Sequence, residues 1–253
     1  MKSILVTGGT GTLGSLVCDR LREHGHEVRV LSRHAKPYAV DLRDGTGLDA
    51  AIDGVDAIVH CATAPRGGDD KAAAHLLAAA RRAAVPHLVY ISIVGVDRVP
   101  LGYYRVKHKV ERMIEEAGAK SPRDSGLGWT VLRTTQFHDL VFRLVAGAAR
   151  LPVLPLPSGV STQPIDTAEV AYRLAELAVG APAGRVEDMG GPEVRPLADL
   201  ARAYLSATGK RRPIVPVRLA GKAYAGFRAG AHLTPERAVG KVTFEQFLTR
   251  RLG

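Results

Sequence analysis

Short apolar runs alternate with amphipathic runs over the first half of the chain. An apolar segment at residues 4–6 is followed by Leu13, Val17 and Leu21, which recur at helical spacing. Positions three or four apart share one face of a helix, so this pattern predicts an amphipathic helix, and Gly25 is suited to end it. The chain therefore opens with a strand and a helix.

The same alternation continues to about residue 133. Further strands are predicted at residues 28–31, 39–40, 57–60, 87–92 and 129–133, and further helices at residues 69–84 and 103–117. Strands that alternate with helices imply βαβ units and a parallel sheet with right-handed crossovers. We predict an α/β fold with a doubly wound, Rossmann-like parallel sheet, which binds ligands at the carboxyl ends of its strands.

The regular pattern weakens after Phe137. Residues 151–164 hold four prolines and predict an irregular excursion. Helices are predicted at residues 167–179, 197–207 and 244–251, and a last strand at residues 186–189. We divide the chain into a Rossmann region over residues 1–150 and a small C-terminal lobe over residues 151–253, whose elements return to the sheet within a single structural unit.

A glycine-rich segment joins the first predicted strand to the first helix. It reads Thr7-Gly8-Gly9-Thr10-Gly11-Thr12-Leu13-Gly14. Glycines let a backbone approach a pyrophosphate closely because no Cβ intervenes, and the helix N-terminus offers unpaired N–H groups and partial positive charge. The segment predicts a nucleotide-binding βα unit.

The glycine spacing leaves two alternatives. The spacing is G-x-x-G-x-x-G rather than G-x-G-x-x-G, and it nearly fits the triphosphate-binding pattern G-x-x-x-x-G-K-[ST]. Ser15 stands where that pattern needs its lysine, so a triphosphate would lose its main charge partner. A tight glycine turn without a ligand is the other alternative.

Composition indicates an ordinary globular protein. The 253 residues are 46% hydrophobic and 24% charged, and no apolar run approaches the roughly 20 residues of a membrane span. The chain begins directly with a strand, so we expect no signal peptide. Cys18 and Cys61 are the only cysteines and lack metal-ligand spacing. We expect a cytoplasmic protein with no membrane association and no bound metal.

The formal charge of +10 is typical of proteins that bind nucleic acids, so we considered this function. The basic residues are dispersed, with short clusters at residues 81–82, 210–212 and 250–251. Aromatic residues make up 5% and are not interleaved with them, and no nucleic-acid-binding motif is present. We expect a solvated basic surface that favours a phosphate-bearing small molecule, and no nucleic-acid partner.

Two further segments accompany the glycine turn. They read Tyr90-Ile91-Ser92-Ile93-Val94-Gly95 and Tyr103-Tyr104-Arg105-Val106-Lys107. With them the chain resembles the short-chain dehydrogenase/reductase superfamily, and most of all its atypical branch of NmrA-like and isoflavone-reductase-like NAD(P)-binding proteins. The resemblance covers nearly the whole chain, including Gln163-Pro164-Ile165-Asp166, and it is specific for the superfamily rather than for one reaction.

The resemblance implies where a dinucleotide binds. Its pyrophosphate would lie over Gly8, Thr10, Gly11, Thr12, Leu13 and Gly14. At the end of the second strand, Ser32 and Arg33 stand where NAD-preferring proteins carry an acid. A hydroxyl and a guanidinium suit a 2′-phosphate, so we expect NADP(H) rather than NAD(H). The alternative is that Arg33 is a surface charge.

Two more strand ends complete the expected cofactor site. Asp41 and Leu42 match the family's adenine-contacting segment, although Asp41 is also plausible as a turn residue. Cys61, Ala62 and Thr63 follow the fourth strand, where the backbone would pass close to the cofactor. No base is recognisable beside Cys61, which we interpret as a packing residue rather than a nucleophile.

Tyr103 and Lys107 are the expected catalytic pair. They stand four apart on a predicted helix and share one face. In the superfamily the tyrosine exchanges the proton of a carbonyl or alcohol, and the lysine contacts the nicotinamide ribose and lowers the phenol pKa. Ser92, eleven residues before Tyr103, matches the serine that polarises the substrate oxygen. A register difference of one residue would turn Ser92 to the wrong face.

The substrate side is less defined. Gln136, Phe137 and His138 follow the sixth strand and are expected to border the substrate, with His138 as a substitute proton donor or a packing residue. The segments 151–156 and 223–227 are apolar and suggest a small or hydrophobic substrate over a sugar nucleotide.

The function expected from these features is an NADP(H)-dependent oxidoreductase of the atypical short-chain type. It would reduce a small or hydrophobic carbonyl or an activated double bond, with the cofactor supplying the hydride. The alternative is a non-catalytic, NmrA-like redox sensor, which the hydrophobic Ile93 and Val94 after Ser92 favour. A nucleotide-sugar epimerase is less favoured. The sequence predicts no oligomeric state.

Overall fold

The fold of this computed structural model is described for residues 1–64, 67–119 and 126–253. The chain divides into two compact units. Unit 1 comprises Met1–Ser92, Gly102–Arg133 and Val170–Glu187, and unit 2 comprises Ile93–Leu101, Thr134–Glu169 and Asp188–Gly253. The chain alternates between these units, whereas the sequence suggested one boundary at residue 150. Each unit is therefore described by itself.

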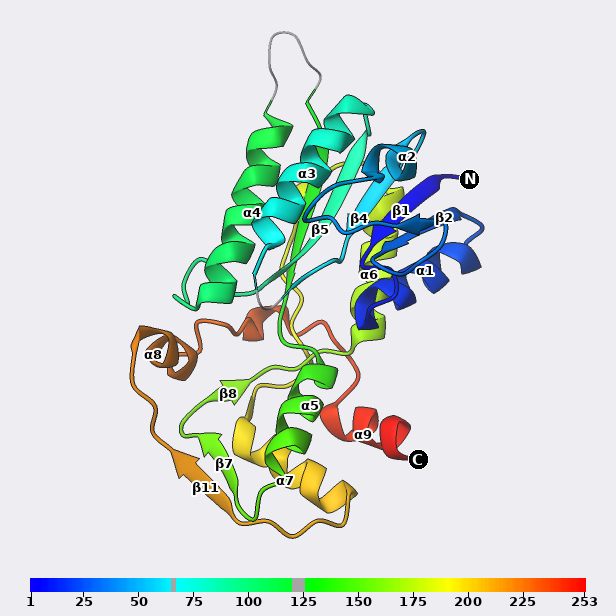
Figure 1. The fold of residues 1–253 in the computed structure, drawn as a ribbon. Helices are drawn as coiled ribbons and strands as arrows, with labels where there is room; N and C mark the ends of the chain where they lie inside the picture. The colour runs from blue at the N-terminus through cyan, green and yellow to red at the C-terminus, as the bar shows by residue number, and fades with distance from the viewer. Residues whose placement is uncertain (65–66, 120–125) are drawn as a thin grey trace. The chain divides into compact units, whose positions relative to one another are not determined.

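Unit 1 is built on a parallel sheet. Its strands are β1 (Ser3–Thr7), β2 (Glu27–Ser32), β3 (Tyr38–Ala39), β4 (Ala57–His60), β5 (His87–Ile93), β6 (Gly128–Thr134) and β9 (Gly184–Arg185). They form a seven-stranded sheet in the order β3-β2-β1-β4-β5-β6-β9 (Figure 1). Strand β1 pairs in parallel with both β2 and β4, so the order reverses there. This reversal is the switch point at which open α/β sheets bind ligands, and it confirms the predicted fold class.

Helices cover both faces of the sheet. They are α1 (Thr12–Glu23), α2 (Leu48–Ile52), α3 (Asp69–Arg82), α4 (Gly102–Gly118) and the part of α6 (Thr167–Val179) from Val170 onward. Helices α2, α3 and α4 share one buried cluster with Leu5, Ile58 and Leu88 of the sheet. Ile4 and Val6 alternate to the opposite face. Helices α1 and α6 lie together there (Figure 1), with the Arg20 guanidinium 5.2 Å from the Tyr172 ring centroid.

Local sequence explains why these elements form. The central strands β1 and β4 are continuous apolar runs buried on both faces, as parallel strands between helices require. Helix α3 is rich in alanine, the best helix former, with Asp69 and Asp70 in its first turn and Arg81 and Arg82 in its last. These charges complement the helix dipole.

Most predicted elements of unit 1 are present. The last strand is displaced, because β9 occupies Gly184–Arg185 rather than residues 186–189. The chain nevertheless stays beside β6 after β9 ends, since the Val186 N–H donates to the Val131 carbonyl at 3.1 Å. The short helix α2 was not predicted.

Unit 2 contains short strands and helices around its own core. Its strands are β7 (Leu154–Pro157), β8 (Ser161–Thr162), β10 (Arg195–Pro196) and β11 (Ile214–Val217). Its helices are α5 (His138–Ala148), α7 (Leu197–Ala207), α8 (Lys222–Arg228), the 3-10 turn η1 (Pro235–Arg237) and α9 (Phe244–Leu252). The first residues of α6, up to Glu169, also belong to unit 2. Helices α5, α7 and α9 meet around Val145, Tyr204 and Phe247. The region 151–164, expected to be irregular, contains β7, which pairs in parallel with β11.

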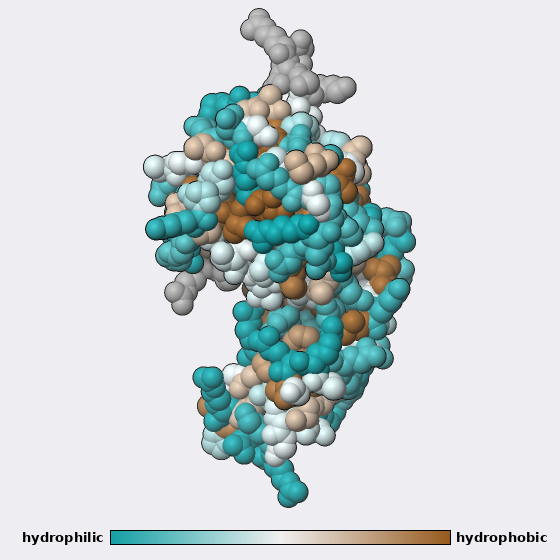
Figure 2. Space-filling model, turned by 90° about the vertical axis from the view of Figure 1, so that its right-hand side faces the viewer, coloured by the Kyte–Doolittle hydropathy of each residue, from teal (hydrophilic) through white to brown (hydrophobic). Residues whose placement is uncertain are grey.

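The surface is largely charged. Hydrophilic residues predominate on the face drawn in Figure 2, where hydrophobic residues gather in limited patches. Many exposed charges form ion pairs, such as Arg82 with Asp49 at 2.6 Å. Among the described helices, none combines the length and the apolar composition that a membrane span requires.

Candidate functional site

The glycine-rich turn packs directly on neighbouring backbone. Gly8 has a φ of +66°, which favours glycine, and a Cβ there would lie 2.8 Å from the Ala62 backbone. A Cβ on Gly14 would lie 2.3 Å from the Gly8 carbonyl oxygen. No side chain fits at either position without moving the main chain. The turn between β1 and α1 is thus a bare backbone cradle beside the end of β4.

The start of α1 presents unpaired donors at this cradle. Gly11 is the N-cap and supplies no side-chain cap, and the first turn holds no acidic residue. Ser15 N–H already bonds to the Gly11 carbonyl at 3.0 Å. Within the described parts of the chain, the N–H groups of Thr12 and Leu13 have no acceptor. Free N–H groups and the positive end of the dipole fit the diphosphate of a dinucleotide.

The end of β2 exposes a cation. The Ser32 hydroxyl accepts hydrogen bonds from the N–H groups of His34 and Ala35, at 3.4 and 3.1 Å, and so fixes the turn. Arg33 is exposed on this turn. Its charge contributes to the lowered pKa of the Asp41 carboxyl, after the larger effect of Arg43. The positive charge of Arg33 thus lies at the end of β2, where an anion could approach it from solvent.

Asp41 is already paired. Its carboxylate accepts from Arg43 Nε at 3.0 Å and Arg43 Nη2 at 2.6 Å, and these bonds hold the pKa of Asp41 well below its usual range. The Asp41 carbonyl accepts from Gly45 N–H at 3.0 Å, which supports the turn interpretation. Leu42 is buried, and its carbonyl bonds to His75 Nδ1 at 3.0 Å. Contact of this segment with adenine stays a prediction.

The end of β4 is held by buried polar groups. Thr7 Oγ1 lies 2.7 Å from His60 Nδ1 and accepts from Ala62 N–H at 3.3 Å. Burial, with the nearby Lys107 charge, lowers the pKa of His60 to about 3, so the ring is neutral. Burial raises the pKa of Cys61 to about 12. The Cys61 thiol therefore stays protonated, which supports its interpretation as a packing residue.

Lys107 is a buried cation at the start of α4. Its Nζ donates to the Ile91 carbonyl at 3.1 Å and lies 4.6 Å from the Tyr90 ring centroid. Burial lowers the pKa of Lys107 to about 8, although the Asp69 carboxylate acts in the opposite direction. The ammonium is thus fixed between a carbonyl and an aromatic face.

Tyr103 belongs to a chain of oxygen atoms. Its hydroxyl lies 2.9 Å from Thr63 Oγ1, and Thr63 Oγ1 donates to Asp69 Oδ2 at 2.6 Å. Burial first, and then the Asp69 charge, raise the pKa of Tyr103. We expected Lys107 to lower this pKa, but its ammonium is engaged by Ile91 and Tyr90 instead.

Asp69 was missed by the sequence analysis. Its Oδ1 also accepts from Ala64 N–H at 2.6 Å, and only 5% of the residue is exposed. The available signal was its position in the first turn of the helix that follows β4, close to the carboxyl end of that strand.

Ser92 lies on the face of β5 that carries Leu88 and Tyr90. Side chains alternate along a strand, so these three residues share one face, the face that Lys107 covers. The Ser92 and Tyr90 hydroxyls are both buried and have no hydrogen-bond partner among the described residues. Unpartnered buried hydroxyls are rare, and here they lie at the carboxyl end of the sheet where a ligand is expected.

The three expected substrate residues lie in unit 2. Gln136 Oε1 accepts from Thr162 Oγ1 at 2.8 Å, and Phe137 caps α5. His138 is 1% exposed, and its Nε2 donates to the Val242 carbonyl at 2.9 Å. Its ring stacks on Phe247, and burial lowers its pKa. These contacts support the packing interpretation of His138 rather than proton donation.

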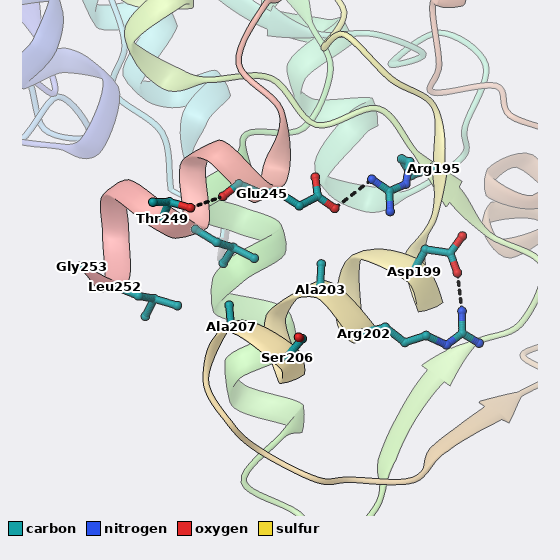
Figure 3. Close-up of a pocket in the computed structure, with 11 residues that line it drawn as sticks. Arg195, Asp199, Arg202, Ala203, Ser206, Ala207, Glu245, Thr249, Leu252 and Gly253 are labelled. Carbon is teal, nitrogen blue, oxygen red and sulfur yellow. Dashed lines mark hydrogen bonds and ion pairs between the residues drawn. The ribbon is translucent and has the colours of Figure 1, made fainter.

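A groove in unit 2 is a separate feature. It has a volume of about 820 Å³ and lies between α7 and α9 (Figure 3). Its rim carries the ion pairs Arg195–Glu245 and Arg202–Asp199, and its floor includes Ala203. None of the expected site residues lines it. The candidate site is therefore the group of residues at the carboxyl ends of β1, β4 and β5.

A doubly wound sheet with a bare glycine cradle at the carboxyl end of its first strand is the arrangement that binds dinucleotides. The chain belongs to the NAD(P)H-binding family, whose model matches residues 8–176. It is 32% identical over 207 residues to a (4-alkanoyl-5-oxo-2,5-dihydrofuran-3-yl)methyl phosphate reductase of Streptomyces griseus, covering 75% of this chain and 68% of the relative. It is 29% identical over 252 residues to a 2-alkyl-3-oxoalkanoate reductase of Stenotrophomonas maltophilia, covering 83% and 76%.

Solved structures share the fold. An NADPH-dependent quinone oxidoreductase from Escherichia coli, complexed with NADPH, superposes with a TM-score of 0.80 over 99% of this chain and all of that chain, at 18% identity. A nucleoside-diphosphate-sugar epimerase from Staphylococcus aureus gives 0.78 over 97% and 99%, at 16% identity. The expected superfamily and the expected class, an NAD(P)-dependent oxidoreductase, are thereby confirmed.

Proposed function

We propose that the protein is an NADP(H)-dependent reductase that acts on a small or hydrophobic carbonyl compound or an activated double bond. The observation that carries the proposal is that Tyr103 and Lys107 lie one helical turn apart on α4, in the same unit as the glycine cradle. The two reductases described above are named for substrates that contain a carbonyl group. The two free cysteines and the absence of a disulfide in the described residues support a reducing cytoplasmic location.

The residues of the chain have distinct roles in this proposal. The N–H groups of Thr12 and Leu13 hold the diphosphate, and Arg33 binds the 2′-phosphate of NADP(H). Bound reduced nicotinamide supplies the hydride. Lys107 holds the nicotinamide ribose, and Tyr103 donates a proton to the substrate oxygen.

Ser92 completes the proposed site. Its unpartnered hydroxyl is a donor for the substrate oxygen, since it lies on the face of β5 that Lys107 covers. Closing these groups against water strengthens each interaction at the reacting oxygen.

A panel assay tests the reductase proposal. NADPH is mixed with the protein and with quinones, ketones and aldehydes, and the loss of absorbance at 340 nm is followed in wild type and Tyr103→Phe. We expect turnover that falls about 100-fold or more in the variant, because the general acid is lost. Tight NADPH binding without consumption across the panel would instead support a non-catalytic redox sensor.

A binding assay tests the cofactor preference. Arg33→Ala should weaken NADPH binding by about 10- to 150-fold and leave NADH binding nearly unchanged, since a charge-assisted bond of roughly 1.5–3 kcal/mol is lost only with the 2′-phosphate. The control is Arg112→Ala, which removes an exposed arginine of unit 1 paired with Glu116. Equal losses for the two dinucleotides would remove the preference for NADP(H).

A further inference from the structure

The Tyr103 hydroxyl has one defined hydrogen-bond direction. Thr63 has a single hydroxyl hydrogen, which it donates to Asp69 Oδ2 at 2.6 Å. Its oxygen therefore offers only lone pairs to Tyr103, 2.9 Å away, and the phenol must donate. The order of donation is Tyr103 to Thr63 to Asp69.

The carboxylate at the end of this chain is fixed in place. Asp69 Oδ1 accepts from Ala64 N–H at 2.6 Å, and the residue sits in the first turn of α3. The carboxylate therefore lies at the positive end of the helix dipole. The residue is 5% exposed.

No other group in the described residues offers Tyr103 a hydrogen-bonded path to a carboxylate. Lys107 Nζ is bonded to the Ile91 carbonyl, and Glu111 is bound in both oxygens by Arg133, at 2.8 and 2.6 Å. The Tyr90 hydroxyl has no described partner. The path through Thr63 is therefore the one that the hydrogen bonds define.

We propose that Thr63 and Asp69 form a proton relay that serves Tyr103. The inference rests on the proposed role of Tyr103 as general acid. When the Tyr103 O–H bond breaks and an O–H bond forms on the substrate oxygen, the hydride having come from the reduced dinucleotide, a phenolate remains. Water then protonates the Asp69 carboxylate, Asp69 passes this proton to Thr63 Oγ1, and Thr63 passes its own hydroxyl proton to the phenolate, which restores the resting hydrogen bonds. In the oxidative direction each proton moves the opposite way. Thr63 and Asp69 act through Tyr103 and are positioning residues.

The first test needs no substrate. The ionisation of Tyr103 is followed by absorbance near 295 nm, as the difference between each protein and its Tyr103→Phe counterpart. Asp69→Asn removes a negative charge near the phenol and should lower its pKa by about one unit. Thr63→Val keeps the shape of the side chain but removes the hydroxyl that stabilises the phenolate, and should raise the pKa. An unchanged titration in both variants would overturn the relay.

The second test uses kinetics with 1,4-benzoquinone, 4-nitrobenzaldehyde and ethyl acetoacetate as oxidants of NADPH. Thr63→Val should lower kcat, measured at saturating NADPH, about tenfold and should change the pH profile and the solvent isotope effect. Thr63→Ser restores the hydroxyl and should recover most of kcat.

The two tests separate the relay from the proposed function. A Tyr103→Phe variant that turns over normally would remove the proposed acid. If turnover depends on Tyr103, but Thr63→Val leaves kcat, the pH profile and the isotope effect unchanged, the relay is contradicted and the proposed function is not. If none of the three oxidants is consumed, the absorbance titration decides the relay. Far-UV circular dichroism of Asp69→Asn checks its fold, and Thr63→Val with Thr63→Ser provides the test if Asp69→Asn does not fold.

Discussion

The ammonium of Lys107 lies over the ring of Tyr90, 4.6 Å from its centroid. One side chain comes from α4 and the other from β5, so this contact joins the helix to the sheet beside the carboxyl end of β5. The Ile91 carbonyl, 3.1 Å from Nζ, fixes the ammonium from the strand itself. A cation held in this way is the charge that a dinucleotide would meet.

The pKa of Lys107 predicts how binding depends on pH. Because burial lowers this pKa to about 8, the side chain loses its charge as the pH rises through that value. We expect NADPH affinity to be constant below about pH 7 and to fall several-fold by about pH 9, since a charge-assisted bond weakens. Fluorescence titration across this range measures the effect.

Two variants check that Lys107 is the group responsible. Lys107→Met should bind NADPH weakly and without this pH dependence. Lys109→Met removes an exposed lysine on the same helix, which is paired with Asp70 at 2.7 Å, and should retain the wild-type profile. If the NADPH affinity of Lys107→Met still falls as the pH rises toward 9, a group other than Lys107 causes the fall.

Gly14→Ala tests the glycine cradle. The new Cβ would lie 2.3 Å from the Gly8 carbonyl oxygen, so the turn must shift. We expect a loss of about 1–3 kcal/mol in the free energy of unfolding, as for other overpacked sites, together with loss of dinucleotide binding. Urea unfolding and calorimetric titration with NADPH measure the two effects.

Gly147→Ala is the matched control. Gly147 lies inside α5, where a Cβ would meet nothing within 4 Å. Alanine should stabilise this helix by about 0.5–1 kcal/mol and leave NADPH binding unchanged. Equal losses of stability in the two variants would mean that the contact with Gly8 does not constrain the turn.

Local signals in the sequence predicted the cradle and the Tyr103–Lys107 pair. The β1 strand, the glycine turn and α1 follow one another within the first 23 residues, and Tyr103 and Lys107 lie one helical turn apart. Such features depend on neighbouring residues, so periodicity and spacing reveal them.

Partners distant in the sequence could not be predicted. Thr63 and Tyr103 are separated by 40 positions, and their contact depends on how α3 and α4 pack on the sheet. The same packing directs Lys107 to the Ile91 carbonyl and buries the Tyr103 phenol, and this burial is the main reason that the pKa of Tyr103 is raised.

Helix α5 was missed for a different reason. Its N-cap, Phe137, provides no capping side chain, and Leu144 is 61% exposed, so the apolar positions do not mark a single buried face. Strand β7 was hidden by Pro155 and Pro157, which normally argue against a strand. Its pairing with β11 over Leu154–Pro157 shows that a two-stranded edge tolerates them.

Buried histidines predict that acid destabilises the protein. Burial lowers the pKa of His60 to about 3 and those of His87 and His232 to about 4. The unfolded chain binds protons at these residues below about pH 6.5 and the folded chain does not, so stability falls as the pH decreases from 6.5 toward 4. Each histidine contributes a slope of up to about 1.4 kcal/mol per pH unit.

His60→Gln isolates one of these contributions. Between pH 7.5 and pH 5 the variant should lose about 2 kcal/mol less unfolding free energy than wild type, since one group no longer takes up a proton on unfolding. Urea unfolding at the two values measures the difference. His24→Gln, at an exposed position, should follow the wild type, and a His60→Gln slope equal to that of wild type would contradict the assignment.

The buried pair of Arg133 and Glu111 gives the last prediction. Arg133 Nε and Nη2 donate to the two Glu111 oxygens at 2.8 and 2.6 Å, and both side chains are less than a tenth exposed. Glu111→Leu removes the buried carboxylate that binds the Arg133 guanidinium and should cost about 3–5 kcal/mol of unfolding free energy. The double variant Glu111→Leu with Arg133→Met should recover most of this loss, because two apolar side chains replace two desolvated charges. Urea unfolding of the single and double variants forms the thermodynamic cycle. If the double variant is as unstable as the single one, the loss comes from packing around Glu111 rather than from the broken ion pair.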